Sequence, residues 1–322
     1  MITVIAGGVG AARMLRALLL VADAADITAI VNVGDDLTLH GLHISPDLDT
    51  VVYTLADAIN PETGWGLVDE SWQARATLSQ YGGESWFGLG DRDLGTHLYR
   101  TQRLSEGADL ATVTAEISRA WNLGLKVLPA TCDRLRTMVT LAEDDPEAAD
   151  YPPLPAGTEV SFQEYFVRRQ HSVPISSVRF DGAEESTPTK GAIDAIDGSD
   201  VIAIAPSNPL VSIAPVLAVP ALREALIRNR SRVVAVSPII SGAALKGPAD
   251  RMLTELGHDA SVIGVASLYS EVTSTMVIDT ADAESAPAIE AMGLSVLVTD
   301  TIMARPGVGE SLARAVLSGV LR

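Results

Sequence analysis

The chain opens with a short apolar run, a glycine turn and an amphipathic segment. Residues 2–6 are apolar except for Thr3, which is typical of a short strand buried on both faces. Apolar residues recur at helical spacing over residues 11–22, and residues 27–33, which are mostly apolar, predict a second strand. This order predicts a βαβ unit with parallel strands and a right-handed crossover.

The same alternation returns in the second half of the chain. Further strands are predicted at residues 126–129, 137–142, 175–180, 200–205, 232–236 and 296–299. Further helices are predicted at residues 110–121, 214–228, 248–257 and 308–320, and a loop followed by a helix at residues 47–59. Alternating strands and helices indicate the α/β class, here a Rossmann-like, mostly parallel sheet with helices on both faces.

Three stretches depart from this alternation. Residues 61–103 hold three of the four tryptophans and several glycines, which predicts an irregular, partly helical insertion over the sheet. Residues 144–155 are acidic and rich in proline, as expected of a surface loop. Ser161 and Glu164 have the spacing of a capping box that opens a short helix.

The composition fits a packed globular protein and argues against several kinds of partner and site. Hydrophobic residues make up 47% of the 322 positions, and charged residues 20%. The formal net charge of -18 argues against nucleic-acid binding, which depends on clustered Lys and Arg. The one cysteine, Cys132, excludes an intrachain disulfide and a cysteine-based zinc cluster. The N-terminus lacks the basic region of a signal peptide and no apolar stretch reaches 18 residues, so we expect a cytoplasmic protein without a membrane contact.

The glycine turn after the first strand is a candidate anion site. Gly7, Gly8 and Gly10 leave backbone N–H groups exposed at the positive end of the following helix. The turn is neither a dinucleotide fingerprint, because Arg13 stands at the third glycine position, nor a P-loop, because no Gly-Lys-Ser/Thr follows. A plain tight turn is the alternative interpretation.

Polar residues follow the second predicted strand and precede the next helix. Asn32, Asp35 and Asp36 stand at the carboxyl end of that strand, where ligands of open α/β sheets bind. Asp47 and Asp49 can converge on a hard cation such as Mg²⁺. Alternatively, Asp35 and Asp36 are ordinary turn residues. Likewise, Asp49 could be a helix N-cap and Asp47 a solvated side chain.

The segment from Trp86 to His97 combines two aromatic residues, several glycines and an Asp-Arg-Asp run, which would make a poor core. Aromatic faces suit a flat heterocycle, and the guanidinium of Arg92 suits a phosphate or carboxylate. For His97 alone, a structural role is the alternative.

Two later loops also follow predicted strands. The first leaves Ser207, Asn208 and Ser212 as donors between prolines, and the second carries Lys246 as a point charge for phosphate. The alternatives are a stiff connection in which Ser212 caps the next helix, and a mobile surface loop with a solvated lysine. Several such loops, with Thr299-Asp300-Thr301 after the last strand, predict one shared crevice.

In this order, the segments resemble the family of 2-phospho-L-lactate transferases, the CofD and FbiA enzymes. The matching segments span the chain and read AGGVGAARML, NVGDD, SPDLDTVVYTL, WFGLGDRDLGTHL, APSNPLVSI, SPIISGAALKGPA and VTDTIM. A related branch, of the UDP-sugar-binding YvcK type, shares the glycine turn and the Ser-Asn-Pro loop. The GLGDRDL segment is expected to separate the two.

The resemblance implies a Rossmann-like nucleotide-binding domain at residues 1–60 and 125–322. It implies an inserted, largely helical substrate region at residues 61–124 and about 143–190. It also implies a homodimer, a Mg²⁺ ion and two substrates, the deazaflavin Fo and a GDP-activated three-carbon acid. The acid, 2-phospho-L-lactate or phosphoenolpyruvate, passes as a substituted phosphate group to the ribityl hydroxyl of Fo, and GMP leaves. The product is coenzyme F-420-0 or its dehydro form, and the alanine-rich, acidic sequence favours the phosphoenolpyruvate donor.

The resemblance also gives the residues roles. Asp49 and Arg92 are expected to be catalytic, and Asp47 and Asp49 to hold the metal. The deazaflavin is assigned to Asp49, Trp86, Asp91, Arg92 and His97. The nucleotide is assigned to Gly7, Gly8, Gly10, Asn32, Asp35, Ser207, Asn208, Ser212 and Lys246.

Three other functions remain open at this point. A regulatory protein of the YvcK type would bind a UDP-sugar and catalyse nothing. An NAD(P)-dependent oxidoreductase is disfavoured by Arg13 and by Asn32, which stands where an acidic residue would cap the second strand. A P-loop-like kinase is disfavoured by the missing Gly-Lys-Ser/Thr.

Overall fold

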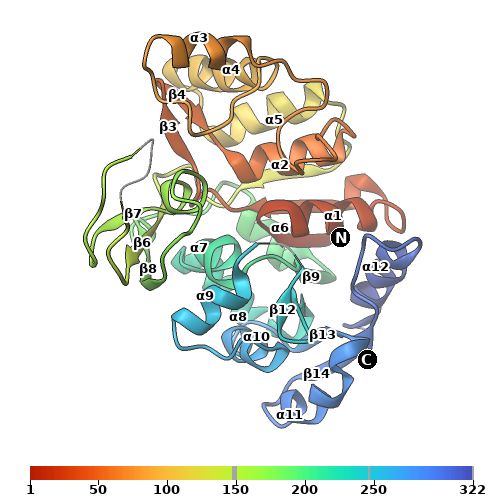
Figure 1. The fold of residues 1–322 in the computed structure, drawn as a ribbon. Helices are drawn as coiled ribbons and strands as arrows, with labels where there is room; N and C mark the ends of the chain where they lie inside the picture. Colours follow the sequence, from red (N-terminus) through yellow and green to blue (C-terminus); the bar gives the residue numbers. More distant parts are fainter. Residues whose placement is uncertain (147–150, 246, 321–322) are drawn as a thin grey trace.

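The computed structural model describes residues 1–146, 151–245 and 247–320. Its centre is a seven-stranded, all-parallel sheet of strand order β14-β13-β10-β9-β1-β2-β5 (Figure 1). The strands are β1 (Ile2–Ala6), β2 (Ile27–Val31), β5 (Lys126–Pro129), β9 (Val201–Ile204), β10 (Val233–Val236), β13 (Thr275–Asp279) and β14 (Ser295–Thr299). The α/β class and the parallel sheet predicted from the sequence are confirmed.

Helices cover both faces of the sheet. Every residue of β1, β9, β10 and β13 is buried, although successive side chains of a strand point to opposite faces. The elements around the sheet are α1 (Gly8–Leu18), η1 (Ala24–Asp26), α6 (Ala192–Gly198), α8 (Pro220–Arg228), η4 (Arg230–Arg232), α9 (Ala249–Glu255), α10 (Val262–Tyr269), η5 (Thr280–Ser285), α11 (Ala286–Glu290) and α12 (Val308–Ser318). Of the α-helices among these, α6, α10 and α11, like the strand β13, were not predicted from the sequence.

The prediction of one continuous helix at residues 214–228 is wrong. The chain instead forms η3 (Pro209–Ile213), α7 (Ala214–Leu217) and then α8. Pro220 is the first residue of α8, where its missing N–H costs nothing, but the same ring cannot continue a helix from α7. Among the described residues no single helix is long and apolar enough to cross a membrane; only Pro209–Leu217 and Pro220–Arg228 reach the length together, across a 90° bend.

A helical region lies above the sheet in Figure 1, formed by α2, α3, α4 and α5 with the β3–β4 hairpin at its side. Its elements are β3 (Leu37–Leu39), β4 (Leu42–Ile44), α2 (Pro46–Leu55), α3 (Gln73–Gln80), α4 (Asp93–Ser105) and α5 (Leu110–Ala120). Residues 61–124 contribute three of these helices and no strand of the central sheet. The division of the chain into a nucleotide-binding domain and an inserted substrate region stays a prediction.

A second small unit is a three-stranded antiparallel sheet of order β7-β6-β8, seen at the left of Figure 1. It consists of β6 (Arg136–Leu141), β7 (Glu159–Ser161), β8 (Ile175–Asp181) and the π-helix η2 (Glu164–Arg168). The strands predicted at residues 137–142 and 175–180 therefore exist but lie outside the parallel sheet. The hydroxyl of Ser161 accepts a hydrogen bond from the N–H of Glu164 at 3.2 Å, which is the capping contact that the sequence predicts.

Candidate active site

A cavity of 610 Å³ opens beyond the carboxyl ends of the central strands. Loops that follow β1, β2, β9, β10 and β14 line it, together with the helical region and the π-helix η2. Ligands of open α/β sheets bind at this edge, because the loops from neighbouring strands meet there. The structure thus brings the polar loops that the sequence places at strand ends into one crevice.

The glycine turn forms one wall of this cavity and is held tightly against the loop after β9. A Cβ atom on Gly10 would lie 2.0 Å from the carbonyl oxygen of Pro206, so only glycine allows this approach. The next residue, Ala11, donates its backbone N–H to the hydroxyl of Ser207 at 3.1 Å. Two segments that the sequence assigns to nucleotide binding are therefore joined directly.

Asn208 and Ser212 also line the cavity. The sequence suggested Ser212 as a possible helix cap, but in the structure Asn208 has this role. The Asn208 Oδ1 accepts the N–H of Leu210 at 2.9 Å, so Asn208 caps η3. Ser212 lies inside η3 and is not a cap. The Asn208 side chain is preferred at this end because its short amide oxygen reaches the free N–H groups of the first turn.

Buried carboxylates face the glycine turn from α2. This helix begins at Pro46, with Ser45 as its N-cap, so Asp47 and Asp49 lie in its first turn and not in a preceding loop. Neither the solvated Asp47 nor the N-capping Asp49 considered from the sequence is found, because both side chains are buried. The amide of buried Asn32 donates to Asp47 Oδ2 at 2.9 Å. Burial raises the pKa of Asp47 to about 7.

Asp35 and Asp36 add negative charge to the same corner. Burial, and then the charges of Asp47 and Asp36, raise the pKa of Asp35 well above its usual value. Asp36 Oδ2 accepts hydrogen bonds from Ser45 and from His43 Nε2, at 2.9 and 3.0 Å. One oxygen each of Asp35 and Asp36 is buried without a hydrogen-bond partner among the described residues. Such oxygens can accept a cation or a donor from a ligand.

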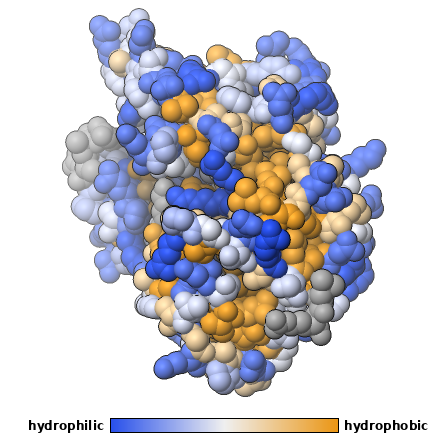
Figure 2. All heavy atoms as spheres, turned by 90° about the vertical axis from the view of Figure 1, so that its right-hand side faces the viewer, coloured by the Kyte–Doolittle hydropathy of each residue, from blue (hydrophilic) through white to orange (hydrophobic). Residues whose placement is uncertain are grey.

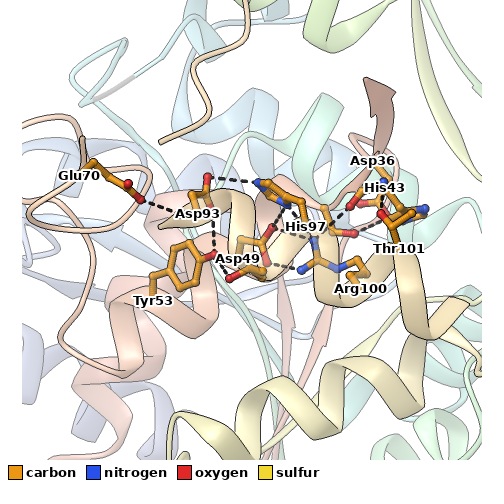
Figure 3. A network of polar contacts seen from close by, with 11 residues as sticks. Asp36, His43, Asp49, Tyr53, Glu70, Asp93, His97, Arg100 and Thr101 are labelled. Atoms are coloured by element: carbon orange, nitrogen blue, oxygen red, sulfur yellow. Dashed lines mark hydrogen bonds and ion pairs between the residues drawn. The ribbon is translucent and has the colours of Figure 1, made fainter. Parts of the chain in front are cut away.

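Asp49 belongs to a buried network that reaches Asp36 through Arg100 and His43 (Figure 3). The guanidinium of Arg100 contacts both carboxylate oxygens of Asp49, with Nη1 3.1 Å from Oδ2. His97 lies between two carboxylates, its Nδ1 3.7 Å from Asp49 and its Nε2 3.2 Å from Asp93. Tyr53 donates its hydroxyl to Asp93 at 2.6 Å. Asp49, Tyr53, Asp93 and His97 all line the cavity.

The pKa values of Asp49 and Asp93 are shifted in opposite directions by this network. Burial raises the pKa of Asp49, although the positive charge of Arg100 opposes the shift. Burial also acts on Asp93, but its contacts with His97 and Tyr53 outweigh burial and lower its pKa. Arg100 was not predicted as a site residue. The signal was its place three residues after His97, on the same face of α4.

Three residues assigned to the deazaflavin do not line the cavity. Asp91 accepts the N–H groups of Gln73 and Ala74 at the start of α3, and with the hydroxyl of Ser71 these contacts lower its pKa. The guanidinium of Arg92 is exposed and donates to the Val68 carbonyl. The Trp86 ring packs beside Phe87 and under Arg168. Lys246, assigned to the nucleotide, lies outside the described residues.

Aromatic residues from other segments reach the cavity instead. Phe162 and Phe166 flank the start of the π-helix η2, with ring centroids 5.4 Å apart and planes 16° apart, and both line the cavity. Trp65 and Phe87 line it from the helical region. The sequence signal for the first pair was two aromatics four residues apart at the capping box of Ser161 and Glu164, a pattern that a buried core helix would share.

The residues present allow a cation at the carboxylates beside the glycine turn. No three carboxylate, imidazole or thiol groups in the described part of the chain form a complete metal site. Mg²⁺, however, is commonly bound by one or two carboxylates together with water and substrate phosphates. Asp47 and Asp35 fit this pattern, because a divalent cation would offset the repulsion between them. Asp49 fits it less well, since Arg100 contacts both of its oxygens.

Comparison with known proteins gives a family match along nearly the whole chain. The sequence model described as 2-phospho-L-lactate transferase CofD matches residues 2–302. A phosphoenolpyruvate transferase of Streptomyces griseus is 41% identical over 318 residues, covering 98% of this chain and 97% of that protein. A phosphoenolpyruvate transferase of Nocardia farcinica is 41% identical over 305 residues, covering 93% and 90% of the two chains.

Among solved structures, a UPF0052-family protein of Bacillus halodurans superposes with a TM-score of 0.62 at 19% identity. The superposition covers 98% of this chain and 99% of that one. This likeness supports the Rossmann-like fold alone. The family match and the curated relatives span nearly the whole chain, so the protein is a transferase and belongs to the 2-phospho-L-lactate transferase family.

Proposed function

We propose that the protein acts in coenzyme F-420 biosynthesis and transfers a phosphoenolpyruvyl group from its GDP-activated form to the ribityl hydroxyl of Fo. GMP would leave, and the product would be dehydro coenzyme F-420-0. The observation that carries the proposal is one 610 Å³ cavity that joins an anion-binding glycine turn, buried carboxylates and aromatic faces. The names of the 41%-identical relatives favour phosphoenolpyruvate over 2-phospho-L-lactate as the transferred acid.

The nucleotide side of the cavity is assigned to the glycine turn and the loop after β9. The N–H groups of the turn lie at the start of α1, where the helix dipole favours phosphate. Ser207 and Asn208 stand beside the turn and keep polar atoms at the cavity wall. This arrangement supports binding of the GDP portion of the donor.

The acceptor side is assigned to the Asp49 network and the aromatic walls. Trp65, Phe162 and Phe166 offer faces that suit a flat deazaflavin ring. Asp49 lies in the cavity with its orientation fixed by Arg100, so it can accept the proton of the attacking hydroxyl or hold that hydroxyl in line. Arg92 and Asp91 lie outside the cavity lining, which moves our proposal for the acceptor site from them to Asp49 and His97.

Magnesium is proposed at Asp47 and Asp35. When bound, it would neutralise the negative charge that builds on the diphosphate as GMP departs. The chain's own residues orient the two substrates: Asn32 fixes the Asp47 carboxylate by its 2.9 Å hydrogen bond, and the glycine turn fixes the phosphates. Positioning and electrostatic stabilisation supply most of the rate enhancement in phosphoryl transfer.

We also propose that the chain works in the cytoplasm as a homodimer, as its family resemblance implies. The face that lies at the right of Figure 1, toward α12 and β14, carries apolar areas between hydrophilic ones (Figure 2). β14 is an edge strand of the central sheet, and its Val298 is exposed. Size-exclusion chromatography with light scattering tests the dimer, and a monomeric mass at micromolar concentration would exclude it.

Ligand-induced stabilisation separates the proposed transferase from a UDP-sugar-binding regulator. At a hundredfold excess over Kd, a ligand that binds the folded chain raises the free energy of unfolding by about 2.7 kcal/mol. We expect GDP with Mg²⁺ to raise the melting temperature and UDP-sugars to leave it unchanged. Stabilisation by a UDP-sugar, without stabilisation by GDP, would replace the proposed function with the regulatory one.

A further inference from the structure

The charges that line the cavity are strongly unbalanced. Asp35, Asp47, Asp49 and Asp93 all line it, whereas Arg13 is the one arginine or lysine among the lining residues of the described chain. A diphosphate that enters such a cavity is repelled by the carboxylates unless positive charge meets it. Magnesium at Asp47 would neutralise one phosphate of the diphosphate. Arg13 is the lining residue that could supply positive charge to the other phosphate.

Arg13 projects from the same helix as the glycine turn. It follows Val9 by four residues, and both line the cavity, so Arg13 lies one turn farther along the cavity-facing side of α1. The beginning of the turn faces Asp47: Cβ atoms on Gly7 and Gly8 would lie 3.1 and 3.5 Å from its oxygens. The end of the turn faces the Pro206 carbonyl and Ser207. An anion held by the turn therefore meets Asp47 at the beginning of the turn, and Arg13 lies on the cavity-facing side of α1 one helical turn beyond Val9.

The guanidinium of Arg13 is free to take a ligand. It is exposed and has no hydrogen-bond or ion-pair partner among residues 1–146, 151–245 and 247–320. The next arginine of α1, Arg16, is exposed as well but is paired with Asp57 and does not line the cavity. Of these two arginines of α1, Arg13 alone lines the cavity with a guanidinium that has no ion-pair partner among the described residues.

We propose that Arg13 binds the nucleoside-side phosphate of the donor and stabilises the departing GMP. In the transfer, an oxygen of the acceptor hydroxyl forms a bond to the phosphorus that carries the three-carbon acid. The bond from this phosphorus to the oxygen bridging to GMP breaks, and its electron pair stays on that oxygen. The hydroxyl proton passes to a carboxylate or to water. Charge-assisted hydrogen bonds from a guanidinium strengthen as this charge develops on the GMP phosphate.

This inference rests on the proposed function, and its test keeps the two apart. GDP and GMP binding would be measured by isothermal titration calorimetry for wild type, Arg13→Ala, Arg13→Lys and the matched control Arg16→Ala. We expect Arg13→Ala to weaken GDP and GMP binding by about 10- to 100-fold, which corresponds to the loss of charged hydrogen bonds to phosphate. Arg13→Lys should lose less, and Arg16→Ala should bind like wild type. Titration with Fo should give the same affinity for all four proteins.

Each outcome decides one of the two proposals. Wild-type GDP affinity in Arg13→Ala would overturn the role of Arg13 and leave the transferase proposal intact. Absence of GDP and GMP binding to the wild-type protein would overturn the proposed function, and the role of Arg13 with it. Because Arg13 is exposed and unpaired, Arg13→Ala should melt at the wild-type temperature, so a loss of nucleotide affinity cannot be attributed to unfolding.

Discussion

At the level of single residues, the ion pair between Asp49 and Arg100 connects stability to the site. Both side chains are buried, and the guanidinium contacts both carboxylate oxygens. We expect Arg100→Ala to lower the free energy of unfolding by about 3–5 kcal/mol, because it leaves a buried carboxylate without its counter-charge. Urea denaturation measures this loss, and turnover should fall with it because Asp49 loses its fixed orientation.

Arg103 on the same helix provides the matched control. It pairs with Glu106 and Glu116 near the surface, so Arg103→Ala should cost no more than about 1 kcal/mol. Equal losses for Arg100→Ala and Arg103→Ala would contradict the importance given to the buried pair.

Asp47 should make stability depend on pH. Its pKa is about 7 in the folded chain and about 3.9 in an unfolded one, so the folded state holds the proton more tightly. The free energy of unfolding should therefore fall as the pH rises from about 4 to about 7. Between pH 5 and pH 8, without divalent cations, wild type should lose about 3 kcal/mol relative to Asp47→Asn, whose amide does not titrate.

Urea denaturation of both proteins at these two pH values tests this prediction. A difference in stability between wild type and Asp47→Asn that stays constant from pH 5 to pH 8 would show that Asp47 titrates normally. Added Mg²⁺ at pH 8 should return stability to wild type and not to Asp47→Asn, because only the carboxylate binds the cation strongly.

At the level of elements, the contact between α1 and the loop after β9 shapes the nucleotide side of the cavity. A methyl group on Gly10 would collide with the backbone of Pro206, which cannot rotate away as a flexible side chain would. We expect Gly10→Ala to cost about 1–3 kcal/mol and to abolish GDP binding, because α1 must move away from Ser207. Thermal melting and GDP titration measure the two effects.

Gly95 in α4 is the control for this substitution. A Cβ atom there would meet nothing within 4 Å, so Gly95→Ala should gain about 0.5–1 kcal/mol from its higher helix propensity. Wild-type GDP affinity in Gly10→Ala would contradict the role given to the glycine turn.

The elements that could be predicted are those whose pattern is local. The strand at residues 233–236 is a continuous apolar run, and the strand at residues 2–6 is apolar except for Thr3, because neighbouring strands and helices bury both of their faces. β13 was missed, because only residues 270–274 separate it from the apolar helix α10, and these contain neither glycine nor proline as a turn signal. The antiparallel pairing of β6 with β8 was also missed, since long-range register is not visible in either segment alone.

The same distinction applies to the candidate site. Gly7, Gly10 and Asp35 could be found because they follow strands at the edge where ligands bind. Asp47 could be found because a second carboxylate, Asp49, stands two residues after it. Phe162 and Phe166 could not, because their position in the cavity depends on how separate parts of the chain pack together. Arg100 could not either, because its ion pair joins two residues 51 positions apart in the chain. Asp91 and Arg92 were assigned to the ligand from a motif, whereas Asp91 caps α3 in the structure and Arg92 bonds the Val68 carbonyl.

At the level of the whole molecule, the site depends on three units that are distant in sequence. The central sheet supplies the glycine turn and the carboxyl-end loops, the helical region supplies the Asp49 network, and the π-helix η2 supplies stacked aromatics (Figures 1 and 3). Nucleotide and deazaflavin are thus expected to meet where these units join. The strongly acidic chain, with a formal net charge of -18, must attract its anionic donor through local groups and a cation.

The most direct test of the proposed transfer is a coupled assay that names the product. The protein would be incubated with Fo, Mg²⁺, GTP, the guanylyltransferase that activates the acid, and either phosphoenolpyruvate or 2-phospho-L-lactate, and the deazaflavins would be analysed by mass spectrometry. We predict a new deazaflavin with the mass of dehydro coenzyme F-420-0 when phosphoenolpyruvate is supplied. Unchanged Fo with both acids, from folded protein and an active guanylyltransferase, would contradict the proposed function.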